Sequence, residues 1–282
     1  MIKRILIPLD PSPYAESAME FGCFIAKHHA AELTGLVVLD MPGIKKSVSP
    51  APLGGIYYAE KLEKLKAKEA KERIQLLLST FREKCQKEGV RYKEAEQQGS
   101  PSERIIRESI YYDAVVVGME TYFHFETTDK PGDSLDKLLN HAITPIYGVP
   151  KTFALPNIPD EKINVLLAFD GSLPSARALQ RFAQLALPDL MNVMIVTAGE
   201  DKVAAEYYLE QAEAYLSTHS IFNIKKEWTS EDIIHAIEKK YLDWSDLVVV
   251  GAHSKKGLFD FMLGSLTKYL IEVAKKPVLI GQ

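Results

Sequence analysis

The residues of this sequence best suited to chemistry form a glycine-containing loop, Gly251-Ala252-His253-Ser254-Lys255-Lys256-Gly257, followed by Gly264-Ser265. Glycines let backbone N–H groups approach a ligand closely. A helix that begins at Ser265 would direct its free N–H groups and its positive dipole end at the same ligand. The hydroxyls of Ser265 and Thr267 and the charges of Lys255 and Lys256 suit an anion as well. The pattern predicts a phosphate site, although a tight turn followed by a serine N-cap, with no ligand, would have the same sequence pattern.

Two other segments are expected to meet this loop. Asp170-Gly171-Ser172 follows an apolar run at 163–169, and Val196-Thr197-Ala198 follows another at 191–197. In doubly wound sheets, ligands bind at the carboxyl ends of the strands, where the strand order switches. We therefore expect both segments to line the same site as the loop.

The elements that position these residues occur twice in the 282-residue chain. Residues 3–12 (KRILIPLDPS) resemble 163–172 (INVLLAFDGS), so that Asp10 corresponds to Asp170. Residues 111–118 (YYDAVVVG) likewise resemble 244–251 (WSDLVVVG). Three matches in the same order, the third closing each half near Pro145 and Pro277, indicate an internal repeat.

Each repeat alternates apolar strands with helical segments, which predicts two tandem doubly wound five-stranded parallel sheets of α/β class. We expect strands near 3–9, 33–39, 90–96, 114–118, 145–149, 163–169, 191–197, 223–229, 247–251 and 277–281. Domains are expected at 1–150 and 163–282, joined by a proline-rich linker at 151–162.

The first repeat contains an insertion between its second and third strands. A Pro/Gly-rich stretch at 41–55 precedes a predicted helix at 58–88. Six apolar residues of this helix recur at helical spacing, which predicts one stripe that faces the core. They are Leu62, Leu65, Ile74, Leu77, Leu78 and Phe81.

Composition limits the classes of function. A net charge of −4 and a pI near 6.0 argue against a broad basic surface for nucleic acid. Cys23 and Cys85 have no metal-ligand spacing and are expected to be buried, unreactive thiols. No apolar run is long enough for a transmembrane helix, and the short N-terminal run is typical of a strand rather than a signal peptide. We expect a soluble cytoplasmic protein without a membrane partner.

The spacing Gly251-x2-Ser254-x9-Gly264-Ser265 resembles the G-x2-G-x9-G-[S/T] loop of the universal stress protein family. The Asp-Gly-Ser at 170–172, the VVVG strand and the closing Pro-Val-Leu-Ile resemble that family too, in two copies over nearly the whole chain. The resemblance implies the adenine nucleotide alpha hydrolase-like fold with strand order 3-2-1-4-5. It also implies ATP binding and an intrachain pseudo-dimer, in which strand 146–149 lies beside strand 278–280.

The resemblance also assigns roles to single residues. The ribose or adenine side is implied for Asp170, and the adenine for the main chain near Val196 and Thr197. Gly171 and Ser172 are expected among the cofactor-binding residues beside Asp170. The phosphates are implied for Gly251, Ser254, Gly264 and Ser265, with Leu266 and Thr267 nearby and His253 shaping the loop. Two departures are Ser254 and Lys256, where the family has glycines. A serine held at positive φ costs about 1 kcal/mol, which would weaken binding about fivefold.

The first repeat departs further from the family pattern. Gly118 to Ser134 spans 16 positions, against 14 from Gly251 to Ser265, and Asp133 replaces Gly264. A carboxylate about 4 Å from a phosphate charge repels it by roughly 4 kcal/mol at an effective dielectric of 20. We therefore do not expect this repeat to bind a nucleoside triphosphate in the usual way. Alternatively, its acidic loop would hold a divalent cation through His124, Glu126, Asp129 and Asp133.

The sequence favours a binding protein over an enzyme, because G-x4-G-K-[S/T], G-x-S-x-G and H-E-x-x-H are all missing. The leading hypothesis is a tandem universal stress protein that binds ATP, with or without Mg²⁺, or another adenine nucleotide in its C-terminal domain. It would act in stress response or signalling. A ligand-free scaffold that contacts proteins and a slow ATP-hydrolysing enzyme are the alternatives. Homodimerisation is compatible with each of them.

Overall fold

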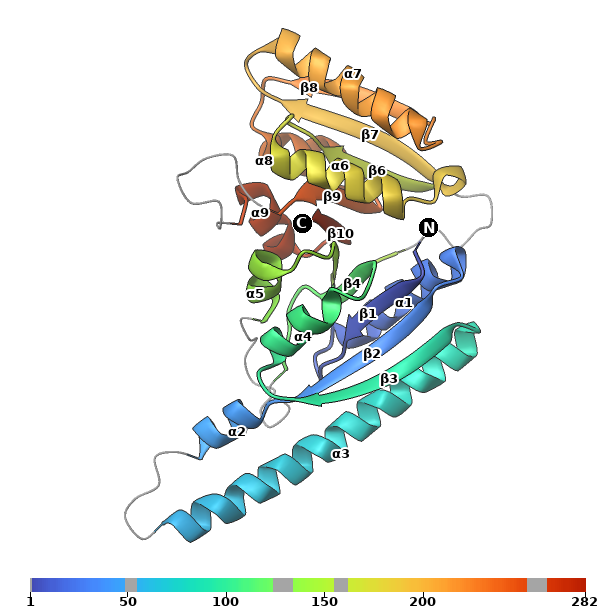
Figure 1. Ribbon diagram of the computed structural model, residues 1–282. Coiled ribbons are helices and arrows are strands. Elements are labelled where there is room, and N and C mark those ends of the chain that lie inside the picture. Colours follow the sequence, from blue (N-terminus) through green and yellow to red (C-terminus); the bar gives the residue numbers. More distant parts are fainter. Residues whose placement is uncertain (1, 49–54, 124–133, 155–161, 253–262) are drawn as a thin grey trace. The chain divides into compact units, whose positions relative to one another are not determined.

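The computed structural model describes residues 2–48, 55–123, 134–154, 162–252 and 263–282 (Figure 1). Contacts divide the chain into a first unit, Ile2–Ala142, and a second unit, Ile143–Gln282. Some residues singled out from the sequence lie outside the described residues. They are His124, Glu126, Asp129, Asp133, His253, Ser254, Lys255, Lys256 and Gly257.

The first unit contains four parallel strands in the order β3-β2-β1-β4. The strands are β1 (Arg4–Pro8), β2 (Glu32–Leu39), β3 (Arg91–Gln98) and β4 (Ala114–Gly118). The helices are α1 (Ala15–His29), α2 (Met41–Ser47), α3 (Ile56–Glu88), α4 (Pro101–Ser109) and α5 (Ser134–His141). Every residue of β4 is buried, as expected of a central parallel strand covered on both faces.

The second unit contains six strands in the order β5-β10-β9-β6-β7-β8. They are β5 (Ile146–Val149), β6 (Ile163–Ala168), β7 (Met191–Ala198), β8 (Ile224–Thr229), β9 (Leu247–Gly251) and β10 (Val278–Gly281). The α-helices are α6 (Leu173–Leu185), α7 (Lys202–Thr218), α8 (Ile233–Ala236), which continues as a π-helix over Ile237–Tyr241, and α9 (Ser265–Val273). A 3-10 turn, Pro188–Leu190, precedes β7.

The predicted fold class and strand order are confirmed. The second repeat has the order β8-β7-β6-β9-β10, which is 3-2-1-4-5, and the first repeat has the order 3-2-1-4 within its own unit. Strand β5, which ends the first repeat, pairs antiparallel with β10 and is grouped with the second unit. Ile146 lies opposite Ile280 and Gly148 opposite Val278, so these two strands are adjacent as predicted.

The repeated sequence motifs have a structural cause. The Asp113 carboxylate accepts hydrogen bonds from the backbone N–H groups of Lys3 (2.6 Å) and Arg4 (2.9 Å), and Asp246 accepts one from Asn164 (2.8 Å). Gly251 ends its strand where an added Cβ would lie 2.6 Å from the backbone of Pro174 in α6. The repeated aspartate therefore anchors the start of the first strand of each repeat, and the repeated glycine leaves room for the start of the helix that follows this first strand.

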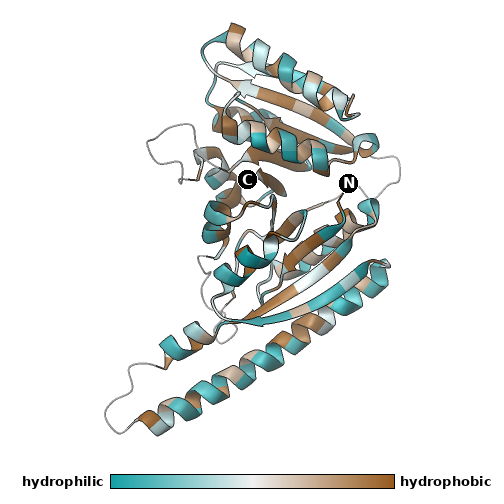
Figure 2. Ribbon diagram, in the orientation of Figure 1, coloured by the Kyte–Doolittle hydropathy of each residue, from teal (hydrophilic) through white to brown (hydrophobic). Residues whose placement is uncertain are grey.

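Helix α3 differs from the predicted core-facing helix. Ile74, Leu78 and Phe81 are buried as predicted, but Leu62 is 43% exposed and Leu65 is 51% exposed. A helix of 33 residues is about 50 Å long, whereas the 8-residue strands β2 and β3 span about 27 Å. The first turns of α3 therefore extend past the end of the sheet of their own unit (Figure 1, Figure 2).

Part of the insertion before α3 is helical too. Residues 41–47, expected in an irregular Pro/Gly-rich stretch, form α2, whose N-cap Asp40 accepts a hydrogen bond from the N–H of Gly43 (2.9 Å). Among the described residues, no helix is both long enough and apolar enough to cross a membrane.

Candidate functional site

A cavity of about 700 Å³ opens at the carboxyl ends of the second unit's strands, here called the second-unit cavity. It lies between the start of α6, the ends of β6, β7 and β9, the loop that precedes α8, and the start of α9. Eight residues singled out from the sequence line it: Asp170, Ser172, Val196, Gly251, Gly264, Ser265, Leu266 and Thr267. The structure thus brings together three segments that are far apart in the sequence.

The Asp170 carboxylate is held in one orientation at the cavity wall. Its Oδ1 accepts hydrogen bonds from the Ser172 backbone N–H (3.0 Å) and from the Ser175 hydroxyl (2.7 Å). Ser172 is the N-cap of α6, and its hydroxyl oxygen accepts the N–H of Ser175 (3.4 Å). The first turn of α6 is therefore capped by its own Ser172, and the same turn holds the Asp170 carboxylate in place.

Helix α9, in contrast, begins without a capping side chain. Its N-cap is Gly264, with φ −63° and ψ 145°, and the first backbone hydrogen bond runs from Lys268 N–H to the Gly264 carbonyl (2.9 Å). Within the described part of the chain, the N–H groups of residues 265–267 have no acceptor. Three free donors at the positive end of a helix form an anion-binding position. Because Gly264 has a negative φ, its contribution is the missing side chain rather than an unusual backbone angle.

Thr267 does not offer its hydroxyl proton to a ligand. Its side chain is buried and donates to the Gly251 carbonyl (2.8 Å). The Gly264 N–H donates to the Ala252 carbonyl (3.1 Å), which joins the same two segments again. These bonds fix the start of α9 against the end of β9, and they leave Ser265, which is exposed, as the hydroxyl available to a ligand.

Two of the residues expected in the site do not line the cavity. The Thr197 hydroxyl is buried and donates to the Phe169 carbonyl (2.6 Å), so it joins β7 to the end of β6. Gly171 has φ +71°, and an added Cβ there would lie 2.7 Å from the ring of Tyr208. Both residues shape the loops around the cavity. His253 and Ser254, which were also expected in the site, lie outside the described residues.

The sequence interpretation missed an acidic part of the cavity wall, formed by Glu200 after β7 and by Glu231 and Asp232 after β8. Asp232 caps α8 by accepting the N–H groups of Ile234 (2.9 Å) and His235 (3.2 Å). Acidic residues therefore line the β7 and β8 ends of the cavity, and the N–H groups at the start of α9, which have no acceptor among the described residues, lie at the β9 end. The missed signal was the polar run that directly follows the third strand, since all parallel strands end at one edge.

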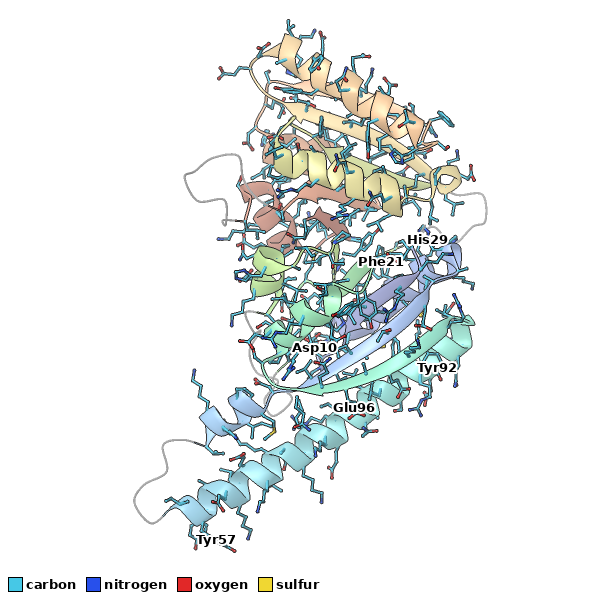
Figure 3. The ribbon with its side chains drawn as sticks, in the orientation of Figure 1. Asp10, Phe21, His29, Tyr57, Tyr92 and Glu96 are labelled. Carbon is cyan, nitrogen blue, oxygen red and sulfur yellow. The ribbon has the colours of Figure 1, made fainter. Side chains whose placement is uncertain are left out.

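The equivalent position in the first unit is closed. Asp10, at the end of β1 (Figure 3), is only 4% exposed. Its Oδ1 accepts the Ser12 hydroxyl (2.6 Å), and its Oδ2 accepts the Tyr122 N–H. Burial raises the pKa of the Asp10 carboxyl. Because Thr121 and Phe123 are buried as well, the segment that follows β4 covers the acid that in the second unit faces a cavity.

Two further sequence expectations concern metal ligands and thiols. Among the described residues, no group of three or more His, Cys, Asp or Glu side chains is arranged to hold a metal ion. Cys23 and Cys85 are buried, as expected. The interaction between the two thiols lowers the pKa of Cys23 and raises the pKa of Cys85.

Comparisons with known proteins match this architecture. Residues 1–147 and 163–281 each match the universal stress protein family. A universal stress protein of Synechocystis sp. is 23% identical over 297 residues, which cover 99% of both chains. The crystal structure of a universal stress protein from Archaeoglobus fulgidus has a TM-score of 0.71 at 18% identity, covering 99% of this chain and 96% of that one. A putative universal stress protein from Pseudomonas aeruginosa has a TM-score of 0.59 at 15% identity, covering 99% and 92%.

Proposed function

Because this chain belongs to the universal stress protein family, we propose that its second unit binds ATP or another adenine nucleotide in the second-unit cavity. We propose that the protein acts in stress response or signalling through this bound nucleotide. One observation carries the proposal: the uncapped start of α9 and the fixed carboxylate of Asp170 line the same cavity.

The two ends of the cavity suit the two ends of a nucleotide. Free N–H groups at residues 265–267 would bind a phosphate. The Asp170 carboxylate would accept a hydrogen bond from a ribose hydroxyl, since Ser175 already holds it in place. The volume of about 700 Å³ falls within the range of roughly 300–1,000 Å³ that small-molecule sites occupy. Mg²⁺ would accompany the phosphates of ATP.

The direct test is calorimetric titration of the purified chain with ATP, ADP and AMP, each with and without Mg²⁺. The expected result is one nucleotide per chain. Asp170→Asn is expected to weaken binding at least tenfold, because hydrogen bonds to charged groups contribute about 1.5–3 kcal/mol. The matched variant Asp10→Asn, which changes the covered acid of the first unit, is expected to leave the affinity unchanged. A lack of binding at millimolar ATP would contradict the proposal and favour a ligand-free scaffold.

Trp228 offers a second, optical measurement. Its indole N–H donates to the carbonyl of Gly199 (2.9 Å), a residue of the cavity wall. Nucleotide binding is therefore expected to change tryptophan emission, and Trp228→Phe is expected to remove that change. Mass spectrometry of small molecules released from the purified protein would identify the ligand itself.

We further propose that binding takes place without turnover. Asp170 is engaged by Ser172 and Ser175, and the acids at the β7 and β8 ends of the cavity include Asp232, which caps a helix. ATP hydrolysis that persists after purification and disappears in both Asp170→Asn and Ser265→Ala would overturn this view and assign an ATPase to the site. Hydrolysis that is unchanged in both variants would identify a contaminating enzyme.

A further inference from the structure

The first unit carries an extension that its own sheet does not cover. This α2–α3 arm comprises residues 41–48 and 55–69 (Figure 1). The first buried residue of α3 is Ala70. At 1.5 Å per residue, positions 56–69 reach about 21 Å beyond that point. Within the arm, Ile44 is buried and Lys66 donates a hydrogen bond to the Ser47 hydroxyl (2.9 Å), so α2 and α3 support each other.

The arm presents a cluster of exposed apolar side chains to solvent. Their exposed fractions are 68% for Ile56, 70% for Tyr57, 74% for Tyr58, 43% for Leu62 and 51% for Leu65. Tyr58, Leu62 and Leu65 follow one another at spacings of four and three, which places them on one face of the helix. Contiguous exposed apolar surface of this kind marks a contact with another body, because leaving it in water is unfavourable.

The arm is basic, although the chain as a whole is acidic. It contains six lysines, Lys45, Lys46, Lys61, Lys64, Lys66 and Lys68, against three glutamates, Glu60, Glu63 and Glu69. The whole chain has a net charge of −4. At 100° per residue, Lys61, Lys64 and Lys68 lie along one side of the apolar face. The arm therefore combines an apolar face with a positive flank.

We propose that the α2–α3 arm docks on an anionic lipid surface. The apolar face enters the headgroup boundary, and the flanking lysines contact anionic headgroups. A protein partner or a second copy fits less well, because stable protein interfaces use roughly 20–30 residues a side, more than these few exposed side chains supply. A lipid surface needs no matching shape, and short amphipathic helices bind it when apolar burial and charge attraction add.

The length of the arm makes this contact electrostatically favourable. An anionic membrane repels the acidic remainder of the protein. A reach of about 21 Å exceeds the Debye length of about 8 Å at physiological ionic strength. Charges in the body of the first unit are therefore largely screened from the surface that the tip contacts, whereas the lysines of the arm are not. The sequence predicted that Leu62 and Leu65 face the core, and their exposure contradicts that prediction for the arm.

The test is co-sedimentation of the full chain with vesicles of mixed phosphatidylserine and phosphatidylcholine, compared with vesicles of phosphatidylcholine alone. Binding is expected to the mixed vesicles, and it should fall as salt is raised. Lys61→Gln with Lys64→Gln should weaken binding about 25-fold, because each lysine near an anionic surface contributes about fivefold. The matched control is Lys84→Gln with Lys87→Gln at the far end of the same helix, which should bind like the unaltered chain.

The apolar face has its own matched pair. Tyr58→Ser with Leu62→Ser should weaken vesicle binding at least tenfold, whereas Leu76→Ser, at an equally exposed apolar position of α3 outside the arm, should not. Substitution at exposed positions leaves stability nearly unchanged, which circular dichroism would verify. Equal sedimentation of the arm and control variants, or no sedimentation with anionic vesicles, would overturn the proposal. So would concentration-dependent dimerisation that the arm variants abolish, since it would assign the face to a second copy.

Discussion

The substitution Gly264→Asp tests how the second-unit cavity would hold a phosphate. It places a carboxylate at the N-cap of α9, where the backbone angles of φ −63° and ψ 145° suit a capping aspartate without strain. The new carboxylate would accept the N–H groups of the first turn, which the described part of the chain leaves without an acceptor. It also recreates in the second repeat the residue that the first repeat has, Asp133.

Two effects of opposite sign are expected from this substitution. As a helix cap, the carboxylate should raise the free energy of unfolding by only about a few tenths of a kcal/mol, because glycine is itself a tolerated N-cap residue. As a like charge about 4 Å from a phosphate, it should cost roughly 4 kcal/mol of binding at an effective dielectric of 20, which corresponds to about a thousandfold loss of affinity. Thermal unfolding and calorimetric titration with ATP and Mg²⁺ measure the two quantities separately.

A gain in stability together with a loss of ATP affinity would distinguish a charge effect from damage to the fold, which would lower both. Gly264→Ser serves as the matched control, because a serine caps the helix without adding charge. It should raise stability by a similar amount and lower affinity much less. If Gly264→Asp is well folded and binds ATP as tightly as the unaltered chain, the start of α9 is not the phosphate position.

Two further predictions concern two glycines with positive φ and the ionisation of Tyr14. Gly89 and Gly171 both have positive φ, +67° and +71°, but an added Cβ meets nothing within 4 Å at Gly89 and lies 2.7 Å from the Tyr208 ring at Gly171. Chemical denaturation should show that the free energy of unfolding falls by about 1 kcal/mol in Gly89→Ala and by about 2–4 kcal/mol in Gly171→Ala. Equal losses would refute the prediction that the added Cβ at position 171 is crowded by Tyr208. Burial, and then Glu120, raise the pKa of Tyr14 to about 12, so its contribution to stability is complete below pH 10, the ordinary value, and is lost as pH rises through 12. In ultraviolet absorbance titration, with Tyr14→Phe as the reference, Glu120→Gln should lower this pKa but leave it above 10, and an unchanged pKa would contradict the effect assigned to Glu120.

The sequence predicted the features of the site that depend on local patterns. Asp170 and Gly264 were found because a buried strand ends in a polar turn and because the Gly-Ser pair at 264–265 indicates the start of a helix. The acidic wall after β8 was missed, because a polar run after a strand is typical of any loop. Only the parallel sheet, which ends all its strands at one edge, brings Glu231 and Asp232 to the cavity.

Tertiary packing gives different exposure to two aspartates that occupy the same position in the sequence repeat. Asp10 and Asp170 occupy the same position in the two repeats, yet Asp10 is covered and Asp170 lines a cavity. In the first unit, Asp10 accepts a hydrogen bond from the Tyr122 N–H, which lies 112 positions away in the chain, and no local pattern predicts so distant a bond.

The amino-acid sequence by itself determined the tandem repeat, the order of strands and helices, and the residues that end the central strands. These features follow from hydrophobic periodicity and turn chemistry, which act over a few residues. Only the tertiary structure decided which parts of those elements are covered. Leu62 and Leu65 share a helix face, but at 100° per residue that face points away from the face of Ile74, Leu78 and Phe81, which is the one that is buried. Burial depends on what lies beside an element, and that neighbour is distant in sequence.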